Sequence, residues 1–170
     1  MKFLTEDQGR EFVAAANLPV PEDASDGSGY YHSNSYKIPA DAGRKTALAR
    51  RLTAWVDDGA QEVGLLWITG YGIWPSSENQ ALFYLVRHAM SEKRSLRIVP
   101  CHCFDGSDLT AVECLVDLML YFSWDGVFYA PGGEFIVRFS HDEILGVACR
   151  SPSMSIRTVE ELRQLGMTVL

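Results

Sequence analysis

The sequence predicts an α/β fold: three layers, with a mainly parallel sheet flanked by helices and an antiparallel hairpin toward the C-terminus. Two observations predict this class. Apolar, strand-like runs at 62–69, 96–104 and 127–130 alternate with helical patterns, which is typical of right-handed βαβ units. After the third run, Pro131 and Gly132 have the residues of a type II turn, and an alternating segment follows them. That turn predicts the hairpin.

The first third of the chain predicts a helix, a loop and a short strand. Thr5 and Gln8 have the spacing of a capping box, so we expect a helix over 6–16. Residues 21–35 are rich in Gly, Ser, Asp and Asn, which predicts an irregular, mobile loop. A short strand over 36–38 is expected to follow.

Two helices are expected around the first apolar run. Asp41 has the position of an N-cap for a helix over 42–57. The run at 62–69 is continuously apolar, which favours a strand buried on both faces. A helix over 78–91 follows it. We expect the core face of that helix to consist of Leu82, Leu85, Val86 and Ala89.

The second half continues the alternation. Pro100 cannot donate to a strand ladder, so it marks an edge, a bulge or the end of the run at 96–104. The other expected elements are a helix at 109–122, a strand at 134–139, a strand or helical turn at 144–149, and a helix at 159–165.

Composition narrows the class of protein. The 170 residues are 47% hydrophobic and 22% charged, which predicts one globular domain over 1–170. The 15 basic and 22 acidic residues give a net charge of −7, which disfavours binding to nucleic acid or to anionic membranes. Residues 1–10 lack the pattern of an export signal, and no apolar stretch of about 18 residues occurs. We therefore expect a cytoplasmic location and four reduced cysteines.

A parallel sheet would place a ligand site at the carboxyl ends of its strands. Here those ends are 69–74, 101–107 and 130–133, which we expect to form one rim. A glycine-rich turn in the first of them could cradle an anion with its backbone N–H groups. Pro75 occupies the position of the third glycine of a dinucleotide fingerprint, so a tight turn is the alternative interpretation. The ligand-binding candidates are Gly70, Tyr71, Gly72, Trp74, Ser76 and Ser77.

The catalytic candidates are cysteine, histidine and aspartate side chains. Cys101 and Cys103 should face one side of a strand and His102 the other, so we expect no metal and no cofactor there. Nucleophilic catalysis would need Cys103 to lie beside a base and an orienting carboxylate. The alternatives are buried thiols and a solvated turn at 140–143. The full set of catalytic candidates is Cys103, His102, Asp105, His141 and Asp142.

The sequence alone does not determine a function, and two hypotheses stay open. The first is a non-enzymatic binding or interaction domain, which includes a regulatory domain, whose partner is an unknown small molecule or protein. The alternative is a small enzyme, such as a hydrolase, that works in a crevice at the strand ends. A homodimer is a further prediction, because symmetric dimers are common. An enzyme should bring its catalytic side chains within about 3–4 Å of each other in a concave pocket.

Overall fold

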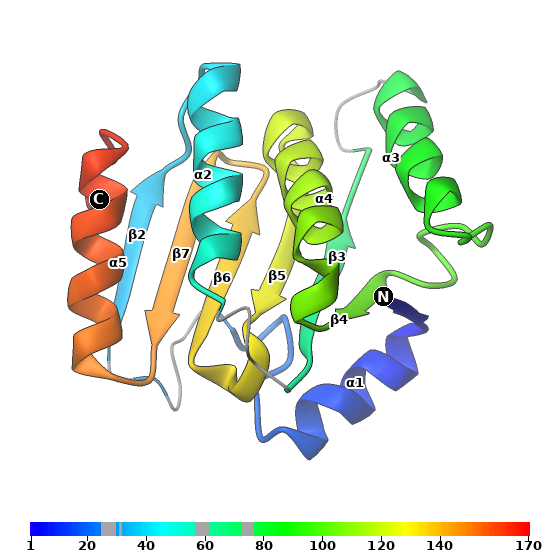
Figure 1. Cartoon of the computed structure of the whole chain (residues 1–170), viewed down its shortest axis with the longest axis horizontal. Coiled ribbons are helices and arrows are strands. Elements are labelled where there is room, and N and C mark those ends of the chain that lie inside the picture. Colours follow the sequence, from blue (N-terminus) through cyan, green and yellow to red (C-terminus); the bar gives the residue numbers. More distant parts are fainter. Residues whose placement is uncertain (25–29, 31, 57–61, 73–76) are drawn as a thin grey trace.

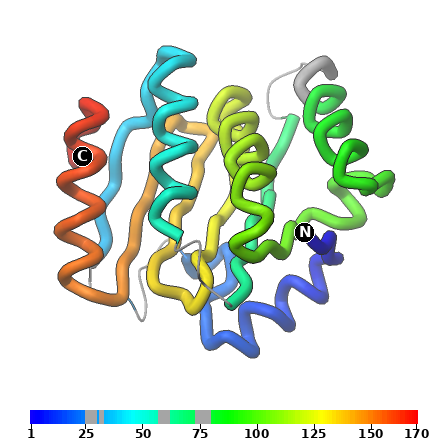
Figure 2. The backbone as a smooth tube through the Cα atoms, viewed as in Figure 1, coloured from blue at the N-terminus to red at the C-terminus, as the bar shows by residue number. Residues whose placement is uncertain are grey.

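The structure is a computed structural model that describes residues 1–24, 30, 32–56, 62–72 and 77–170 (Figure 1). Within these ranges the chain forms one seven-stranded sheet with the order β1-β4-β3-β5-β6-β7-β2, together with five α-helices. Figure 2 follows the same path as a tube. None of the described helices combines the length and the apolar character that crossing a membrane requires.

The bounds of the elements are as follows. The strands are β1 (Lys2–Leu4), β2 (His32–Lys37), β3 (Gly64–Gly70), β4 (Cys101–Phe104), β5 (Asp125–Tyr129), β6 (Phe135–Ser140) and β7 (Ile144–Cys149). The α-helices are α1 (Glu6–Ala15), α2 (Ala42–Ala54), α3 (Ser77–Ala89), α4 (Leu109–Phe122) and α5 (Pro152–Gln164). Short 3₁₀ turns cover Gly106–Asp108 and Pro131–Gly133.

The prediction of a mainly parallel sheet is wrong, because all neighbouring strands pair antiparallel. β4 and β5 do run in the same direction, but each pairs with β3, which lies between them and runs the opposite way. The predicted rim is therefore split. Its segments 101–107 and 130–133 lie at one end of the sheet, whereas the described residues of the third segment, 69–72, lie at the opposite end of β3.

Most individual elements agree with the sequence patterns. The helices predicted at 6–16, 42–57, 78–91 and 109–122 all form, with bounds shifted by at most three residues. The capping box of Thr5 and Gln8 is present, and Asp41 accepts the expected N-cap hydrogen bond.

Four elements differ from the sequence patterns, and one of them, the edge strand β1, was not expected at all. α5 begins at Pro152 instead of 159, because Ser151 provides its N-cap. β2 begins at His32, inside the segment predicted as a loop, and residues 25–29 and 31 of that segment lie outside the described residues. The strand expected over 96–104 is confined to Cys101–Phe104.

The two faces of the sheet are covered unequally. On the face turned toward the viewer in Figure 1, α2 and α4 pack in front of the strands, and Leu48 and Met119 lie in the main core. On the opposite face, α1 packs through Val13 against Trp67 and Tyr129. A Cβ added to Gly9 in α1 would lie 2.5 Å from the Sγ atom of Cys101, so the helix lies directly on β4.

α1 covers only part of its face. Beyond it, the surfaces of β6, β7 and β2 on that side carry Ser33, Ser35 and Arg138, which are exposed. Within the described residues, the molecule therefore has three layers over β4, β3 and β5, and two layers over much of β7 and β2. We call the exposed surface of β6, β7 and β2 on the α1 side the open face.

The predicted core face of α3 is wrong for Leu82, Leu85 and Ala89, whereas Val86 is partly buried and packs against the main core. Leu82 and Leu85 are 50% and 64% exposed, whereas Phe83 and Arg87 are fully buried. Phe83 directs its ring against Trp124, with ring centroids 4.9 Å apart, and that contact fixes the rotation of the helix. Of the tryptophans, Trp55, Trp67 and Trp124 are buried, and Trp74 lies outside the described residues.

Candidate functional site

One end of the sheet brings together two of the segments that the sequence singled out. Gly70 ends β3 opposite Asp125, the first residue of β5. A Cβ added to Gly70 would lie 2.7 Å from the Oδ2 atom of Asp125, so glycine makes room there for the carboxylate. The turn after β6, which contains His141 and Asp142, reaches the same carboxylate. The antiparallel sheet thus joins the Gly70 turn to the His141 turn.

The ligand-binding candidates of the Gly70 turn have separate positions. Tyr71 packs its ring 5.9 Å from that of Trp124 and lines a hollow of about 240 Å³ on the α1 side. Gly72 has a φ of +67°, which satisfies the tight-turn interpretation. Ser77 is the first residue of α3, and the structure describes its backbone but not its side chain. Trp74 and Ser76 also lie outside the described residues.

Asp125 holds His141 through two groups. The His141 backbone N–H donates to Oδ1 over 2.6 Å, and Nδ1 lies 2.9 Å from both carboxylate oxygens. Nδ1 therefore carries the ring proton. The hydrogen bond that Nδ1 donates to the Asp125 carboxylate raises the pKa of His141 above its ordinary value. Nε2 lies 3.7 Å from Oδ1 of Asp142, on the partly exposed side of the ring. This geometry is suited to proton transfer at Nε2.

The open face begins beside this pair. In the strand register, Arg138 of β6 lies between Val127 of β5 and Gly146 of β7, and Gly146 lies opposite Ser35 of β2. Because alternate residues of a strand share a face, Ser140 lies on the same side as Arg138. A hollow of about 70 Å³ is formed there, and Ala24 is part of its wall.

Gly146 leaves the strand backbone accessible. A Cβ added at this position would meet only the Cβ of Arg138, at 3.7 Å, which is an ordinary contact. Packing therefore does not require glycine here. Glycine weakens the middle of a strand, and in that position it often marks the close approach of a ligand or of another backbone.

Arg138 is the charged group of the open face. Within the described part of the chain, no hydrogen bond or ion pair engages its guanidinium. The other cation of this face, Lys37, is paired with Glu143, with Nζ and Oε2 3.4 Å apart. In a chain with a net charge of −7, Arg138 therefore provides a local positive charge.

The catalytic candidates on β4 do not meet His141. Cys103 is buried on the α1 side, and His102 is buried on the helix side, which confirms the predicted alternation. Burial raises the pKa of Cys103, which disfavours the thiolate. Cys103 lies opposite Leu65, five residues from Gly70, and therefore about 17 Å along the sheet from the His141 end.

Asp105 also has a local structural role. It accepts hydrogen bonds from the backbone N–H and the hydroxyl of Ser107, at 2.8 and 2.6 Å. These bonds cap the short turn after β4. The structure thus places Asp105 at the opposite end of the sheet from His141.

Sequence reasoning missed Asp125, Arg138 and Gly146. Asp125 was not among the candidates, although its partner His141 was. A usable signal was present at Arg138, a lone charge on one face of a strand that otherwise alternates regularly. The described residues contain no group of three or more His, Cys, Asp or Glu side chains placed to hold a metal ion.

Comparison with known proteins identified no relative of this chain. No family model, curated protein or solved structure matches this chain.

Proposed function

We propose that the chain is a binding domain whose open face takes a small molecule through a carboxylate or phosphate group. The observation that carries this proposal is the exposed Arg138 guanidinium, which has no partner among the described residues. Arginine presents its N–H groups as a planar fork that matches the oxygens of both kinds of anion.

The neighbours of Arg138 support the same ligand class. Ser33, Ser35 and Ser140 line the hollow, and their hydroxyls can donate to anionic oxygens. Gly146 leaves room for a ligand atom to approach the backbone. The site therefore combines one cation, several hydroxyl donors and an accessible strand.

The size of the hollow favours binding over catalysis. Its volume is about 70 Å³, well below the roughly 300–1,000 Å³ of pockets that enclose a whole small molecule. It can hold one oxyanion group while the rest of the ligand stays outside. Such a site anchors a ligand without excluding water from it.

Isothermal titration calorimetry tests the proposal, with inorganic phosphate and succinate as probes at constant ionic strength. We expect the wild-type chain to bind at least one probe, and Arg138→Met to weaken that binding about tenfold or more, because charge-assisted bonds are lost. Arg50→Met is the matched control, since Arg50 is an exposed arginine on α2. No binding of either probe, or equal weakening by both variants, would refute the proposal.

A second candidate function rests on the pair of Asp125 and His141. Its Nδ1–carboxylate bond of 2.9 Å orients the imidazole for general acid–base chemistry, which favours the hydrolase alternative. The test is hydrolysis of p-nitrophenyl acetate and p-nitrophenyl phosphate by the wild-type chain and by His141→Gln. Turnover that depends on His141 would support an enzyme, and no turnover, or turnover unchanged in the variant, would reject it.

A further inference from the structure

A separate group of buried polar atoms lies between α3, β4 and β1. Among the described residues, Nε and Nη1 of Arg87 and Nε2 of His102 are buried and have no hydrogen-bond partner. Buried polar atoms nearly always have partners, so each exception points to an unseen partner or to strain. Both side chains are fully buried.

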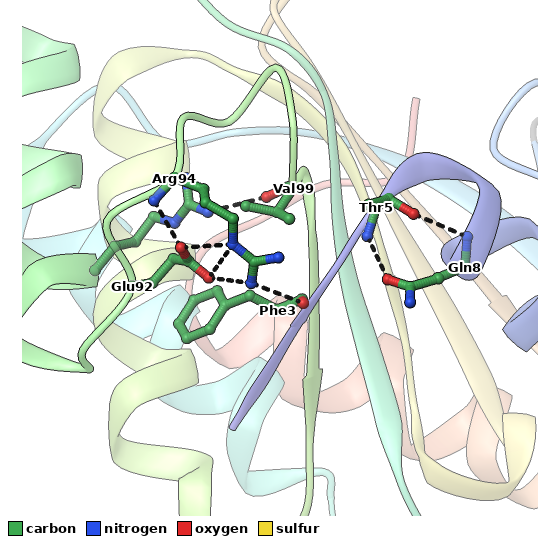
Figure 3. Close-up of polar contacts among 7 residues, drawn as sticks. Phe3, Thr5, Gln8, Glu92, Arg94 and Val99 are labelled. Atoms are coloured by element: carbon green, nitrogen blue, oxygen red, sulfur yellow. Dashed lines mark hydrogen bonds and ion pairs between the residues drawn. The ribbon is translucent and has the colours of Figure 1, made fainter.

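Arg87 lacks a bonded counter-ion. Its Nη2 donates to the carbonyl of Val99 at 3.0 Å, which uses only one of its nitrogens. The nearby buried carboxylate of Glu92 is bound instead by Arg94, through the backbone N–H and the guanidinium (Figure 3). The Arg94 side-chain hydrogen bond lowers the pKa of Glu92 to about 2, so the carboxylate stays charged. It binds Arg94 and forms no hydrogen bond with Arg87.

His102 supplies an acceptor to the same region. Its Nδ1 lies 3.3 Å from the carbonyl oxygen of Leu66, so Nδ1 carries the proton and Nε2 is a bare acceptor. Burial lowers the pKa of His102 to about 3, which keeps the ring neutral at ordinary pH. The region thus contains two unused donor nitrogens and one unused acceptor.

The ring of Phe3 touches both groups. It lies 5.4 Å from Cζ of Arg87, and its centroid is 5.3 Å from that of His102. Phe3 belongs to β1, a strand of three residues at the edge of the sheet, and is itself partly exposed. β1 is held by its pairing with β4 and by the hydrogen bond from Arg94 Nη2 to the Phe3 carbonyl, so the strand stays in place. The partly exposed Phe3 ring can still rotate away from Arg87 and His102, and it can therefore act as a lid.

We propose that Phe3 covers a binding site for a small oxyanion that keeps a proton, held by the free nitrogens of Arg87 and by Nε2 of His102. The negative charge compensates the guanidinium, which water would not do. The retained proton is donated to Nε2. Hydrogen phosphate has both properties at pH 8, whereas sulfate carries the charge without the proton.

Calorimetric titration with phosphate and with sulfate at pH 8 and matched ionic strength tests this site. The titrations use the Arg138→Met background, which weakens the open-face site, and the phosphate binding assigned to the buried site is the part that Arg87→Met removes from this background. We expect phosphate to bind at least about tenfold more tightly than sulfate, because sulfate leaves the His102 acceptor unpaired. Adding Phe3→Ala should strengthen phosphate binding, and adding Arg87→Met should abolish it.

A second measurement covers the case in which Arg87→Met does not fold. The ¹⁵N chemical shift of His102 Nε2 in the Arg138→Met chain should change on addition of phosphate and stay constant with sulfate. Equal responses to the two anions, or phosphate binding that survives Arg87→Met, would overturn the proposal. No response to either anion would also overturn it and leave water as the partner of these atoms.

Discussion

The rotation of α3 gives the sharpest test of the packing. Phe83 is fully buried, whereas Leu85, two residues further on, is 64% exposed. Phe83→Ala should lower the free energy of unfolding by about 3–5 kcal/mol, through lost burial and the cavity left beside Trp124. Leu85→Ala should change it by no more than about 0.5 kcal/mol, because the side chain is mostly in water and alanine favours helix.

Equilibrium urea unfolding at 25 °C measures both changes, with the slope of each transition compared to exclude a change in the unfolded state. Phe83→Leu serves as a milder variant if Phe83→Ala is too unstable to fold. The sequence stripe of Leu82 and Leu85 makes the opposite prediction. A larger loss from Leu85→Ala than from Phe83→Ala would refute the rotation of α3 described above.

Three further predictions test the sheet and its polar end. Gly126→Ala should destabilise by about 1–3 kcal/mol in urea unfolding, because the new Cβ would lie 2.7 Å from the backbone carbonyl oxygen of Trp67, which cannot move aside as the end of Met119 can. Gly146→Ala should be neutral or stabilising by up to about 1 kcal/mol in the same assay, and a large loss would show that packing needs this glycine. Asp125 raises the pKa of His141 in the folded state above the value of 6.5 expected in the unfolded chain. Their pair therefore stabilises the folded state fully below pH 6.5, and this stabilisation is lost as the pH rises through the folded-state pKa. The stability advantage of wild type over His141→Gln should therefore shrink between pH 6 and 9, and a constant advantage would contradict the pairing.

The positions of most helices and strands could be predicted, but strand direction could not. A run such as 62–69 is apolar because α2, α3 and α4 cover one side of it and α1 the other. That pattern is the same whether the neighbouring strands run parallel or antiparallel. Alternation of strands and helices favoured parallel pairing, yet β4 and β5 became separated by β3.

The rotation of α3 was missed for a different reason. Its leucines form a regular apolar stripe, and a buried arginine is rare enough that sequence reasoning places it in water. Here the aromatic contact of Phe83 with Trp124 turns Arg87 inward. The guanidinium then lies over the ring of Phe3 and donates a hydrogen bond to the carbonyl of Val99. Only the tertiary contacts decide between the two orientations.

The candidate site was partly visible in the sequence. The turns around Gly70 and His141 were both singled out, but nothing in their spacing showed that Asp125 would join them. Arg138 and Gly146 gain their significance from register, which places them side by side on neighbouring strands. Register depends on the whole sheet, so residue types alone could not reveal the open face.

Backbone amide NMR spectra recorded during titration with inorganic phosphate and with succinate test the central proposal most directly. We predict shifts for at least one probe that cluster at Ser33, Ser35, Arg138 and Gly146 and disappear in Arg138→Met. Shifts spread evenly over the molecule, or confined to residues outside β6, β7 and β2, would contradict a binding site on the open face.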